Sequence, residues 1–227
     1  MIQSERAYLP AAGHDWFLPI YDPLTKLLGV DTARRALLEQ AGLQPGHRVL
    51  DVGCGTGSLA VLIKRLHPAV EVIALDPDPR ALARAERKAR RAAVSVRLHQ
   101  GFADALGYPD ATFDRVFSSM MFHHLEDGEK EGALREVRRV LRPGGRLELM
   151  DFLRPGSRRH GPLARLLHAH HRLNDNVETR MLDLMAGAGF PQPAKRGERA
   201  LVFGRVAYFQ ATAPTIGRPR GGHSTEV

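Results

Sequence analysis

The sequence predicts an α/β fold in which a mainly parallel sheet carries helices on both faces. From residue 47 onward, short runs rich in β-branched residues alternate with segments of helical periodicity, which is the pattern of strands joined by crossover helices. The stretch 47–59, H-R-V-L-D-V-G-C-G-T-G-S-L, reads as a buried strand that enters a glycine turn and then a helix. Right-handed crossovers place the helices on both faces of the sheet.

The first two strand and helix pairs set this pattern. A strand is expected at 48–52 and a second at 70–76. The helix between them has four apolar residues at the i, i+3, i+4, i+7 spacing of one buried face, and these are Leu59, Leu62, Ile63 and Leu66. A second helix is expected at about 79–93, with its arginines outward and three residues inward, Leu82, Ala85 and Ala89.

Three more strands extend the sheet. They are expected at 94–99, 113–118 and 146–152. Before the last of them lies a helix whose apolar face consists of Leu134, Val137 and Leu141. The turn R-P-G-G-R separates this helix from the strand, because glycine and proline end regular structure.

The remainder of the chain departs from this rhythm. Residues 153–175 read as a loop plus one helix, inserted on the substrate side before the next regular helix at 177–188. Two closely joined strands follow at 194–201 and 204–211. Their short connection predicts an antiparallel hairpin at the edge of the sheet.

The pattern divides the chain into three parts. Residues 1–46 are expected to form a helical cap or lid, with a helix near 32–41, and residues 47–212 form the main domain. Residues 213–227 are expected to be a disordered basic tail.

Composition indicates an ordinary globular protein. A chain of 227 residues fits one compact domain. No run of about 18 uncharged apolar residues could span a bilayer, and the amino terminus lacks the pattern of a secretory signal, so we expect a cytoplasmic protein. The single cysteine, Cys54, excludes a disulfide within the chain and a zinc site built from cysteines.

The net charge of +8 is concentrated in three stretches, residues 80–97, 152–172 and 195–227. A solvated arginine-rich surface is one interpretation, and nucleic acid or another anionic surface as a partner is the other.

The glycine turn predicts a site for a polar ligand, because helix-start amides point at such a ligand and glycines let it approach the backbone. The glycines are spaced G-x-G-x-G at Gly53, Gly55 and Gly57, and Ser58 stands where a dinucleotide-binding loop needs its third glycine. A Lys-Ser/Thr pair typical of phosphate-binding loops does not follow. The spacing therefore weakens a pyrophosphate interpretation.

Three acids follow three consecutive strands. Asp51 precedes the first glycine, where a carboxylate would repel a phosphate but suits an ammonium group. Asp76 ends the second strand, where a carboxylate can accept ribose hydroxyls, and Asp104 could accept from an adenine amino group. Together they describe a ligand with an amine, a ribose and an adenine but no phosphate.

Five ordered motifs carry a family resemblance. They are V-L-D-V-G-C-G-T-G, A-L-D-P-D, Q-G-F-A-D-A-L, F-D-R-V-F-S-S-M-M-F-H-H-L and E-V-R-R-V-L-R-P-G-G-R-L-E-L. Across residues 45–152 the chain resembles the class I S-adenosylmethionine-dependent methyltransferases, and it is most similar to the group that contains the ubiquinone/menaquinone C-methyltransferases. The resemblance implies S-adenosylmethionine as the cofactor and a Rossmann-like sheet of seven strands, in the order 3-2-1-4-5-7-6 with strand 7 antiparallel.

The resemblance also implies roles for individual residues. The methionine part of the cofactor would be lined by Asp51, Gly53, Cys54 and Gly55. Ribose and adenine would contact Asp76, Pro77, Phe102, Ala103 and Asp104. Ser118, Ser119 and Met120 would lie beneath the methionine and the sulfonium. Structural interpretations stand beside these: Gly57 for helix packing, Asp78 as a helix cap, Cys54 as a small packing residue, and Met120 or Met121 as core.

The chemistry needs little from the protein, because the sulfonium methyl is already activated and requires an acceptor atom held in line about 3 Å away. Where the acceptor must lose a proton, His123 or His124 is the candidate base, and one of them could instead cap or pack the following helix. The segment S-S-M-M-F lacks the residues typical of enzymes that methylate base amines. We therefore expect a small, partly apolar acceptor with an O, N or C nucleophile.

The acceptor pocket is expected outside the common core. Tyr8, His14, Trp16 and Tyr21 could fold across the cofactor as a lid, or could form an aromatic staple that fixes the segment to the sheet. The insertion could form the opposite wall. Its three histidines, His168, His170 and His171, do not share one helix face, so no metal site is expected.

Two other functions stay open at this level, as does the choice between a monomer and a homodimer. One is a nucleic-acid-associated module, or an RNA methyltransferase, that uses the basic surface. The other is an NAD(P)-dependent dehydrogenase, which would need a dinucleotide in the glycine loop.

Overall fold

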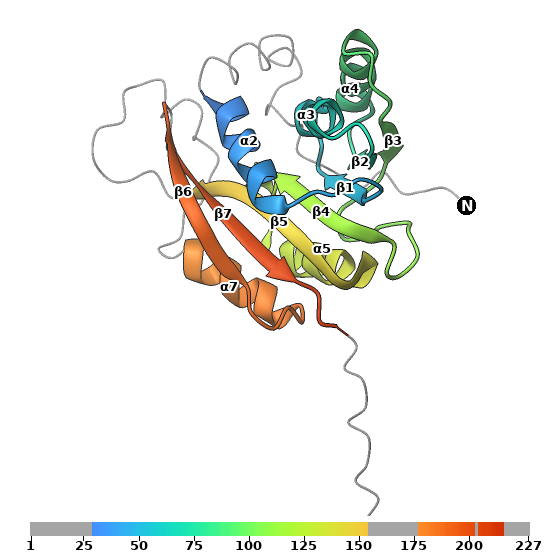
Figure 1. The fold of residues 1–227 in the computed structure, drawn as a ribbon. Coiled ribbons are helices and arrows are strands. Elements are labelled where there is room, and N and C mark those ends of the chain that lie inside the picture. Colours follow the sequence, from blue (N-terminus) through green and yellow to red (C-terminus); the bar gives the residue numbers. More distant parts are fainter. Residues whose placement is uncertain (1–28, 154–176, 203, 216–227) are drawn as a thin grey trace, which may run out of the picture.

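In the computed structural model, residues 29–153, 177–202 and 204–215 are described, and they form one sheet covered by helices (Figure 1). The sheet has seven strands: β1 (Arg48–Val52), β2 (Glu71–Asp76), β3 (Arg97–Gln100), β4 (Phe113–Ser119), β5 (Leu141–Leu153), β6 (Ala194–Leu201) and β7 (Gly204–Thr212). Their order is β3-β2-β1-β4-β5-β7-β6. Strand β7 runs antiparallel to both of its neighbours, while β1 to β5 pair in parallel. The expected order and the terminal hairpin are confirmed.

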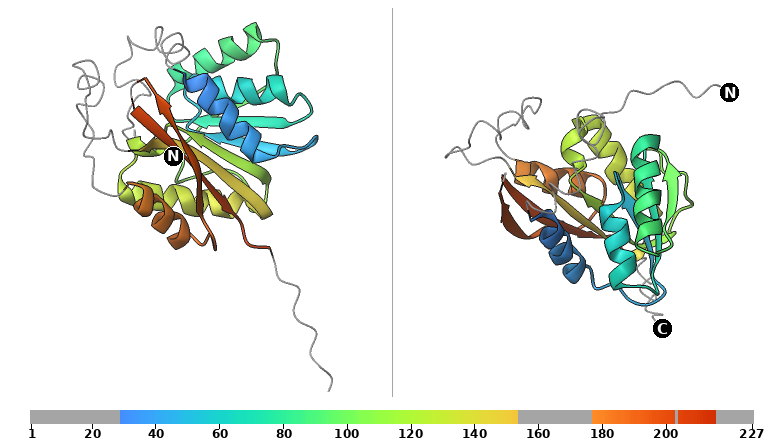
Figure 2. Two further views of the ribbon diagram at one scale, coloured as in Figure 1. Left: turned by 60° about the vertical axis from the view of Figure 1, so that its left-hand side comes forward. Right: turned by 90° about the horizontal axis from the view of Figure 1, so that it is seen from above.

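The helices lie in two layers. They are α2 (Val30–Ala41), α3 (Ser58–Leu66), α4 (Pro79–Arg91), the short 3-10 helix η2 (Phe122–His124), α5 (Asp127–Val140) and α7 (Val177–Gly187). Helices α2, α3 and α4 cover one face of the sheet, and α5 and α7 cover the other (Figures 1 and 2). The helix expected near 32–41 is α2, and it packs on the sheet beside α3.

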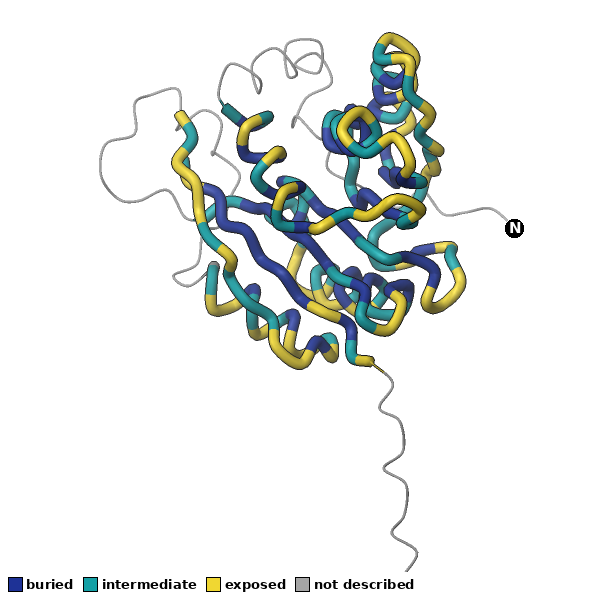
Figure 3. Tube along the Cα trace, viewed as in Figure 1, coloured by how far each residue is buried: buried dark blue, intermediate teal, exposed yellow. Residues whose placement is uncertain are grey.

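Strand alternation divides the core between these two layers. Leu50 and Val52 of β1 pack with Leu134 of α5, while Val49 packs with Leu37 of α2 and other residues of the opposite layer. The central strands are therefore buried on both faces, as the dark tube of Figure 3 shows. This double burial explains why the strands read as continuous apolar runs rather than as alternating ones.

Two predicted helix faces were wrong in detail. Leu66 is 44% exposed and Leu62 is only half-buried, and the buried residues of α3 are Leu59, Ala60, Val61 and Ile63. On α4 the innermost residue is Ala81 rather than Leu82, which is half-buried. Each helix packs both on the sheet and against the other helix, and this second contact turns the buried face away from the single stripe that periodicity suggests.

Some boundaries also differ. Helix α5 ends at Val140, so Leu141 begins β5 instead of continuing the helix. At the carboxyl side, Ala213 is buried and its N–H donates to the carbonyl of Gly145 at 2.8 Å. The first residue of the expected tail therefore belongs to the packed domain. Within the described residues, no helix is long and apolar enough to cross a membrane.

Candidate functional site

The candidate site lies at the carboxyl ends of β1 and β4. From β1 the chain passes to β2 on one side and later returns to β4 on the other side of β1. Ligands of open α/β sheets bind at such a reversal, because the loops on either side diverge and leave a crevice. The glycine turn that follows β1 lies at this point.

The glycine turn is shaped by close contacts. Gly53 has a φ of +69°, and a Cβ there would lie 2.2 Å from Cγ of Met121. Gly57 has a φ of +74°, and a Cβ there would lie 2.7 Å from Cβ of Ala85. The packing interpretation of Gly57 is thus supported, and Gly53 allows the segment after β4 to rest on the turn.

Asp76 ties this turn to β2. Its Oδ2 accepts a hydrogen bond from the N–H of Gly55 at 2.8 Å, and its Oδ1 accepts from the N–H of Asp78 at 3.0 Å. Burial raises the pKa of Asp76, and these two N–H groups partly offset that rise. Asp78 in turn accepts from the N–H of Arg80 at 2.8 Å, so the helix-cap interpretation of Asp78 is confirmed.

A lysine of α4 holds the other side of the turn. The Nζ of Lys88 donates to Oγ1 of Thr56 at 2.9 Å and to Oγ of Ser58 at 2.6 Å. Burial, followed by the nearby Asp51 and Asp76, raises the pKa of the Cys54 thiol. A thiol that resists ionisation is a poor nucleophile, which agrees with a packing role for Cys54.

Asp51 is the most deeply buried acid of the site, at 1% exposure. Burial raises its pKa to about 7, and Asp76 adds to the rise, while Arg34 and the N–H of Ala60 oppose it. Its Oδ2 makes no hydrogen bond within the described residues. A buried carboxylate oxygen with no donor among the described residues has an acceptor position that a ligand could use.

Arg34 of α2 is the cation that acts on Asp51. It is 6% exposed, it pairs with Asp31 at 3.2 Å, and its Nε makes no hydrogen bond in the described part of the chain. The sequence did not single out Arg34. Its signal is a charged residue on the apolar face of α2, where Arg34 stands between Val30 and Leu37 at helical spacing.

The end of β4 lies beside the end of β1, next to the glycine turn. The hydroxyl of Ser118 donates to the carbonyl of Val52 at 3.1 Å, which ties β4 to β1. Met120 adopts a φ of +59°, and its N–H donates to the carbonyl of Met150 at 2.7 Å. A left-handed conformation is costly for a residue with a Cβ, and such strain clusters at functional sites. Met120 is also buried among core residues, so its core interpretation holds as well.

His123 is paired with an acid. Its Nδ1 lies 2.6 Å from Oδ1 of Asp151, and its backbone N–H donates to Oδ2 of the same carboxylate at 2.9 Å. Burial favours the neutral form of Asp151, but His123 and the N–H groups of His123 and Phe152 outweigh it and lower the pKa of Asp151. The ring of His124 lies 4.0 Å from that of His123 between centroids.

Asp151 was not predicted, although a signal was present. It stands in M-D-F near the end of β5, at the same edge of the sheet as Asp51 and Asp76. The rule that acids at parallel strand ends share a site would have included it.

The loop between β3 and β4 carries Phe102, Ala103 and Asp104 and contains no helix. Gly132 of α5 lets the loop approach, since a Cβ there would lie 3.0 Å from Cβ of Asp104. Arg139 anchors the loop by donating to the carbonyls of Leu106 and Tyr108, each at 2.8 Å.

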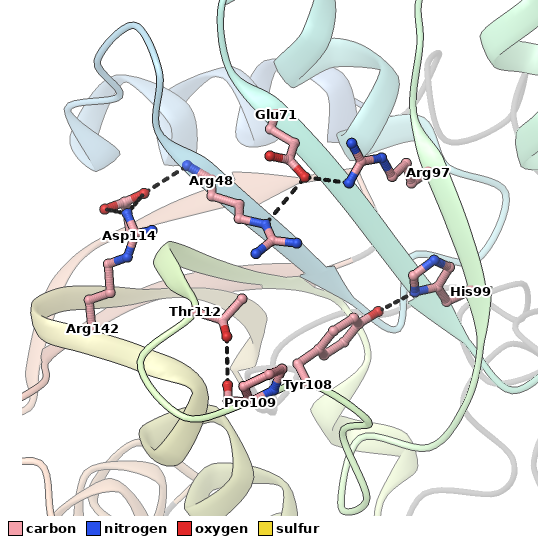
Figure 4. Close-up of polar contacts among 9 residues, drawn as sticks. All are labelled: Arg48, Glu71, Arg97, His99, Tyr108, Pro109, Thr112, Asp114 and Arg142. Carbon is pink, nitrogen blue, oxygen red and sulfur yellow. Dashed lines mark hydrogen bonds and ion pairs between the residues drawn. The ribbon is translucent and has the colours of Figure 1, made fainter.

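A tyrosine and a strand backbone complete this anchoring. The hydroxyl of Tyr108 lies 2.8 Å from Nδ1 of His99 on β3 (Figure 4). Gln100 donates to the carbonyl of Pro77 at 3.0 Å, and the N–H of Gly101 donates to the carbonyl of Asp76 at 3.2 Å. The loop is thereby held beside Asp76, where the sequence placed the adenine contacts.

The lid candidates Tyr8, His14, Trp16 and Tyr21 lie outside the described residues, as do residues 154–176 with their histidines. Their roles stay predictions. Among the residues that the structure does describe, no group of three or more His, Cys, Asp or Glu side chains could hold a metal ion.

Comparison with known proteins shows to which family this chain belongs. Residues 49–145 match the model of a methyltransferase domain. The chain is 31% identical over 213 residues to the ubiquinone/menaquinone biosynthesis C-methyltransferase of Azotobacter vinelandii, a match that covers 83% of this chain and 78% of that protein. The chain belongs to the class I S-adenosylmethionine-dependent methyltransferase family, in the ubiquinone/menaquinone C-methyltransferase-like group.

Other relatives of this methyltransferase family are similar over a shorter span. The chain is 41% identical over 155 residues to the demethylmenaquinone methyltransferase of Deinococcus radiodurans, covering 67% of this chain and 64% of that protein. It therefore spans less than two thirds of the length of that relative. The YcgJ protein of Bacillus subtilis shares the fold with a TM-score of 0.67 at 20% identity, over 81% of this chain and 99% of that one.

Proposed function

We propose that this methyltransferase moves a methyl group from S-adenosylmethionine to a small, partly apolar acceptor with a quinone-type ring. The observation that carries the proposal is the buried Oδ2 of Asp51, which lies near the carboxyl end of β1 and makes no hydrogen bond within the described residues. An ammonium group of the ligand would donate to it.

Arg34 supports the same ligand. Its Nε is buried without an acceptor among the described residues, and its charge acts on Asp51. A ligand with both an ammonium and a carboxylate would use both atoms, and the methionine end of S-adenosylmethionine has both groups. The residues present therefore fit the cofactor, with Asp51 holding the ammonium and Arg34 the carboxylate.

Asp76 would hold the ribose. A carboxylate offers about four acceptor positions, and two of them are taken by the N–H groups of Gly55 and Asp78. These two bonds orient the carboxylate before the ligand arrives. Its remaining lone pairs would accept from the ribose hydroxyls.

The other cofactor contacts follow from the same placement. Pro77, Phe102, Ala103 and Asp104 would flank adenine on the loop that Arg139 anchors. Gly53, Cys54 and Gly55 would line the methionine, with Ser118, Ser119 and Met120 beneath it. When bound, the cofactor supplies an activated methyl group, and the protein has chiefly to hold the acceptor in line with it.

Two observations support a quinone-type acceptor: the names of the relatives and the apolar side chains near His123. The Deinococcus protein is named for demethylmenaquinone and the Azotobacter protein for ubiquinone/menaquinone biosynthesis. Met121, Leu125, Phe152 and Leu153 are half-buried near the ends of β4 and β5, and such a setting suits an apolar ring. A ring carbon is then the proposed attacking atom.

A nucleic-acid acceptor is not favoured. The exposed arginines of α4, among them Arg87 and Arg91, lie on the outer side of a helix whose alanines face inward. This arrangement is that of a solvated helix surface rather than of a groove that leads to the candidate site.

Calorimetry with S-adenosylhomocysteine tests the cofactor assignment. Asp76→Ala should weaken binding by more than about 1 kcal/mol, because a charged hydrogen-bond acceptor is lost. Asp183→Ala, on the exposed side of α7, is the matched control and should bind like the parent protein. Equal affinity of the Asp76 variant, or no binding by the parent, would contradict the proposal.

A further inference from the structure

We propose that Asp151 is a positioning residue that sets His123 as the general base for a weakly acidic hydroxyl on the acceptor ring. The inference rests on the proposed methyltransferase function and adds a proton-transfer step to it. Its basis is the pair of contacts that one buried carboxylate makes to one histidine.

The carboxylate holds His123 at two points. The ring nitrogen Nδ1 is 2.6 Å from Oδ1, and the backbone N–H is 2.9 Å from Oδ2. The Phe152 N–H also donates to Oδ1, at 2.7 Å. A ring held through both its side chain and its backbone has little freedom to rotate, so its orientation is set before an acceptor binds.

The same contacts define the tautomer. An ionised carboxylate only accepts hydrogen bonds, and the donors around Asp151 lower its pKa, so it is ionised at neutral pH. The proton of neutral His123 is therefore on Nδ1, and the lone pair is on Nε2. The His123 side chain is 19% exposed and that of Asp151 only 5%, which puts the acid behind the imidazole.

The position of the pair fits a base. Met121 rests on Gly53 of the glycine turn, and His123 follows two residues later in η2. The segment that carries His123 therefore touches the turn that would line the methionine part of the cofactor. An acceptor ring bound against this segment would lie next to the methyl group.

His124 is the competing candidate. It is the neighbouring titratable side chain on η2, and Asp151 is the acid that faces His123 from β5. The bonds from Asp151 go to the ring and the backbone of His123, which selects His123 as the oriented imidazole.

Proton transfer to His123 precedes methyl transfer. The Nε2 of His123 takes the hydroxyl proton, and the ring carbon beside the resulting oxyanion forms a bond to the methyl carbon. The sulfur–methyl bond breaks and its electron pair stays on sulfur. The proton of the methylated ring carbon then leaves to solvent, and His123 returns its proton to the ring oxygen, so that one proton is released overall.

Kinetics with a reduced short-chain 2-prenyl-1,4-naphthoquinone as the probe test this role. Asp151→Asn should lower kcat about 100-fold, the size of a general-base contribution, with a small change in KM. The loss should shrink toward pH 10, where the hydroxyl ionises without help. Asp127→Asn, an exposed acid at the start of α5, is the matched control and should keep the parent kcat.

An NMR experiment separates a change in the orientation of the His123 ring from general damage to the structure. Imidazole ¹⁵N NMR of the protein with S-adenosylhomocysteine should show His123 protonated on Nδ1, and Asp151→Asn should shift the proton toward Nε2. S-adenosylhomocysteine affinity should stay within about twofold in this variant, since the cofactor contacts are elsewhere. If Asp151→Asn does not fold, His123→Gln is measured by the same kinetics.

Several results would overturn the role. An unchanged tautomer and pH profile in Asp151→Asn would do so, as would a large loss in His124→Gln with full activity in His123→Gln. If the parent protein binds S-adenosylhomocysteine but leaves the naphthohydroquinone unmethylated, the proposed acceptor is wrong. In that case the NMR arm still decides whether Asp151 sets the His123 tautomer.

Discussion

Replacing Asp51 by Asn is expected to abolish a proton release that accompanies binding of S-adenosylhomocysteine, which has the same ammonium group as the methyl donor. Burial raises the pKa of Asp51 from 3.8 to about 7 in the ligand-free protein. An ammonium that donates to Oδ2 favours the ionised form and lowers this pKa again. The ligand therefore displaces a proton from Asp51 wherever the free protein holds one.

The expected number of released protons follows from the Asp51 pKa of about 7. The free protein is about nine-tenths protonated at Asp51 at pH 6, about half at pH 7 and about one-tenth at pH 8. Proton release should fall in the same proportions across this range. The apparent dissociation constant should rise toward tenfold per pH unit below pH 7, because ligand and proton compete for one carboxylate.

The same shift affects folding stability with a definite sign. The folded pKa lies above the unfolded one, so between about pH 4 and pH 7 the folded protein binds a proton that the unfolded chain does not. The Asp51 contribution to the free energy of unfolding therefore falls as pH rises through this window, by about 4 kcal/mol in total, and is level above it. Asp51→Asn should lack this dependence.

Calorimetry in two buffers of different ionisation enthalpy counts the protons. At pH 6 the observed binding enthalpy of the parent protein should differ between buffers by nearly one proton's worth of buffer ionisation, and that of Asp51→Asn should not. Equal enthalpies in both buffers for the parent protein would refute the reasoning, and so would the same proton count in the variant.

Two further predictions concern the neighbours of Asp51. Gly53→Ala places a Cβ 2.2 Å from Met121 on a backbone with positive φ. It should therefore lower the free energy of unfolding, measured by chemical denaturation, by more than about 1 kcal/mol. In the control Gly107→Ala the Cβ meets nothing within 4 Å, so the free energy of unfolding should fall far less. Arg34→Gln should weaken S-adenosylhomocysteine binding about tenfold, as loss of a charged hydrogen bond predicts, while the exposed Arg35→Gln should not. Equal effects of the two glycine substitutions, or of the two arginine substitutions, would contradict these assignments.

Much of the fold was predictable because its signals are local. Strand β1, the glycine turn and α3 follow from a buried run, three glycines and an apolar helix within residues 47–66. The buried face of α3 was predicted less well. Leu66 has the right spacing but is exposed, while Val61 lies outside that spacing and is buried, because packing against both the sheet and the neighbouring helices decides which side of a helix is covered.

Some residues of the candidate site could also be predicted from the sequence, and others could not. Asp51 and Asp76 could be grouped from sequence alone, since the carboxyl ends of adjacent parallel strands lie at one edge of a sheet. Arg34 could not, because its effect on Asp51 depends on how α2 packs across the face of the sheet.

By itself, the sequence determined that the chain forms a mainly parallel sheet, and it predicted a phosphate-free adenosyl ligand at the ends of the first strands. Both follow from short motifs that contain the strands and the acids at their ends. Only the tertiary structure decided that Asp151, 28 residues beyond His123, is the acid that holds this histidine rather than His124. The choice depends on the register between β4 and β5 and on the left-handed turn at Met120. Both are set by packing between elements, which no local pattern encodes.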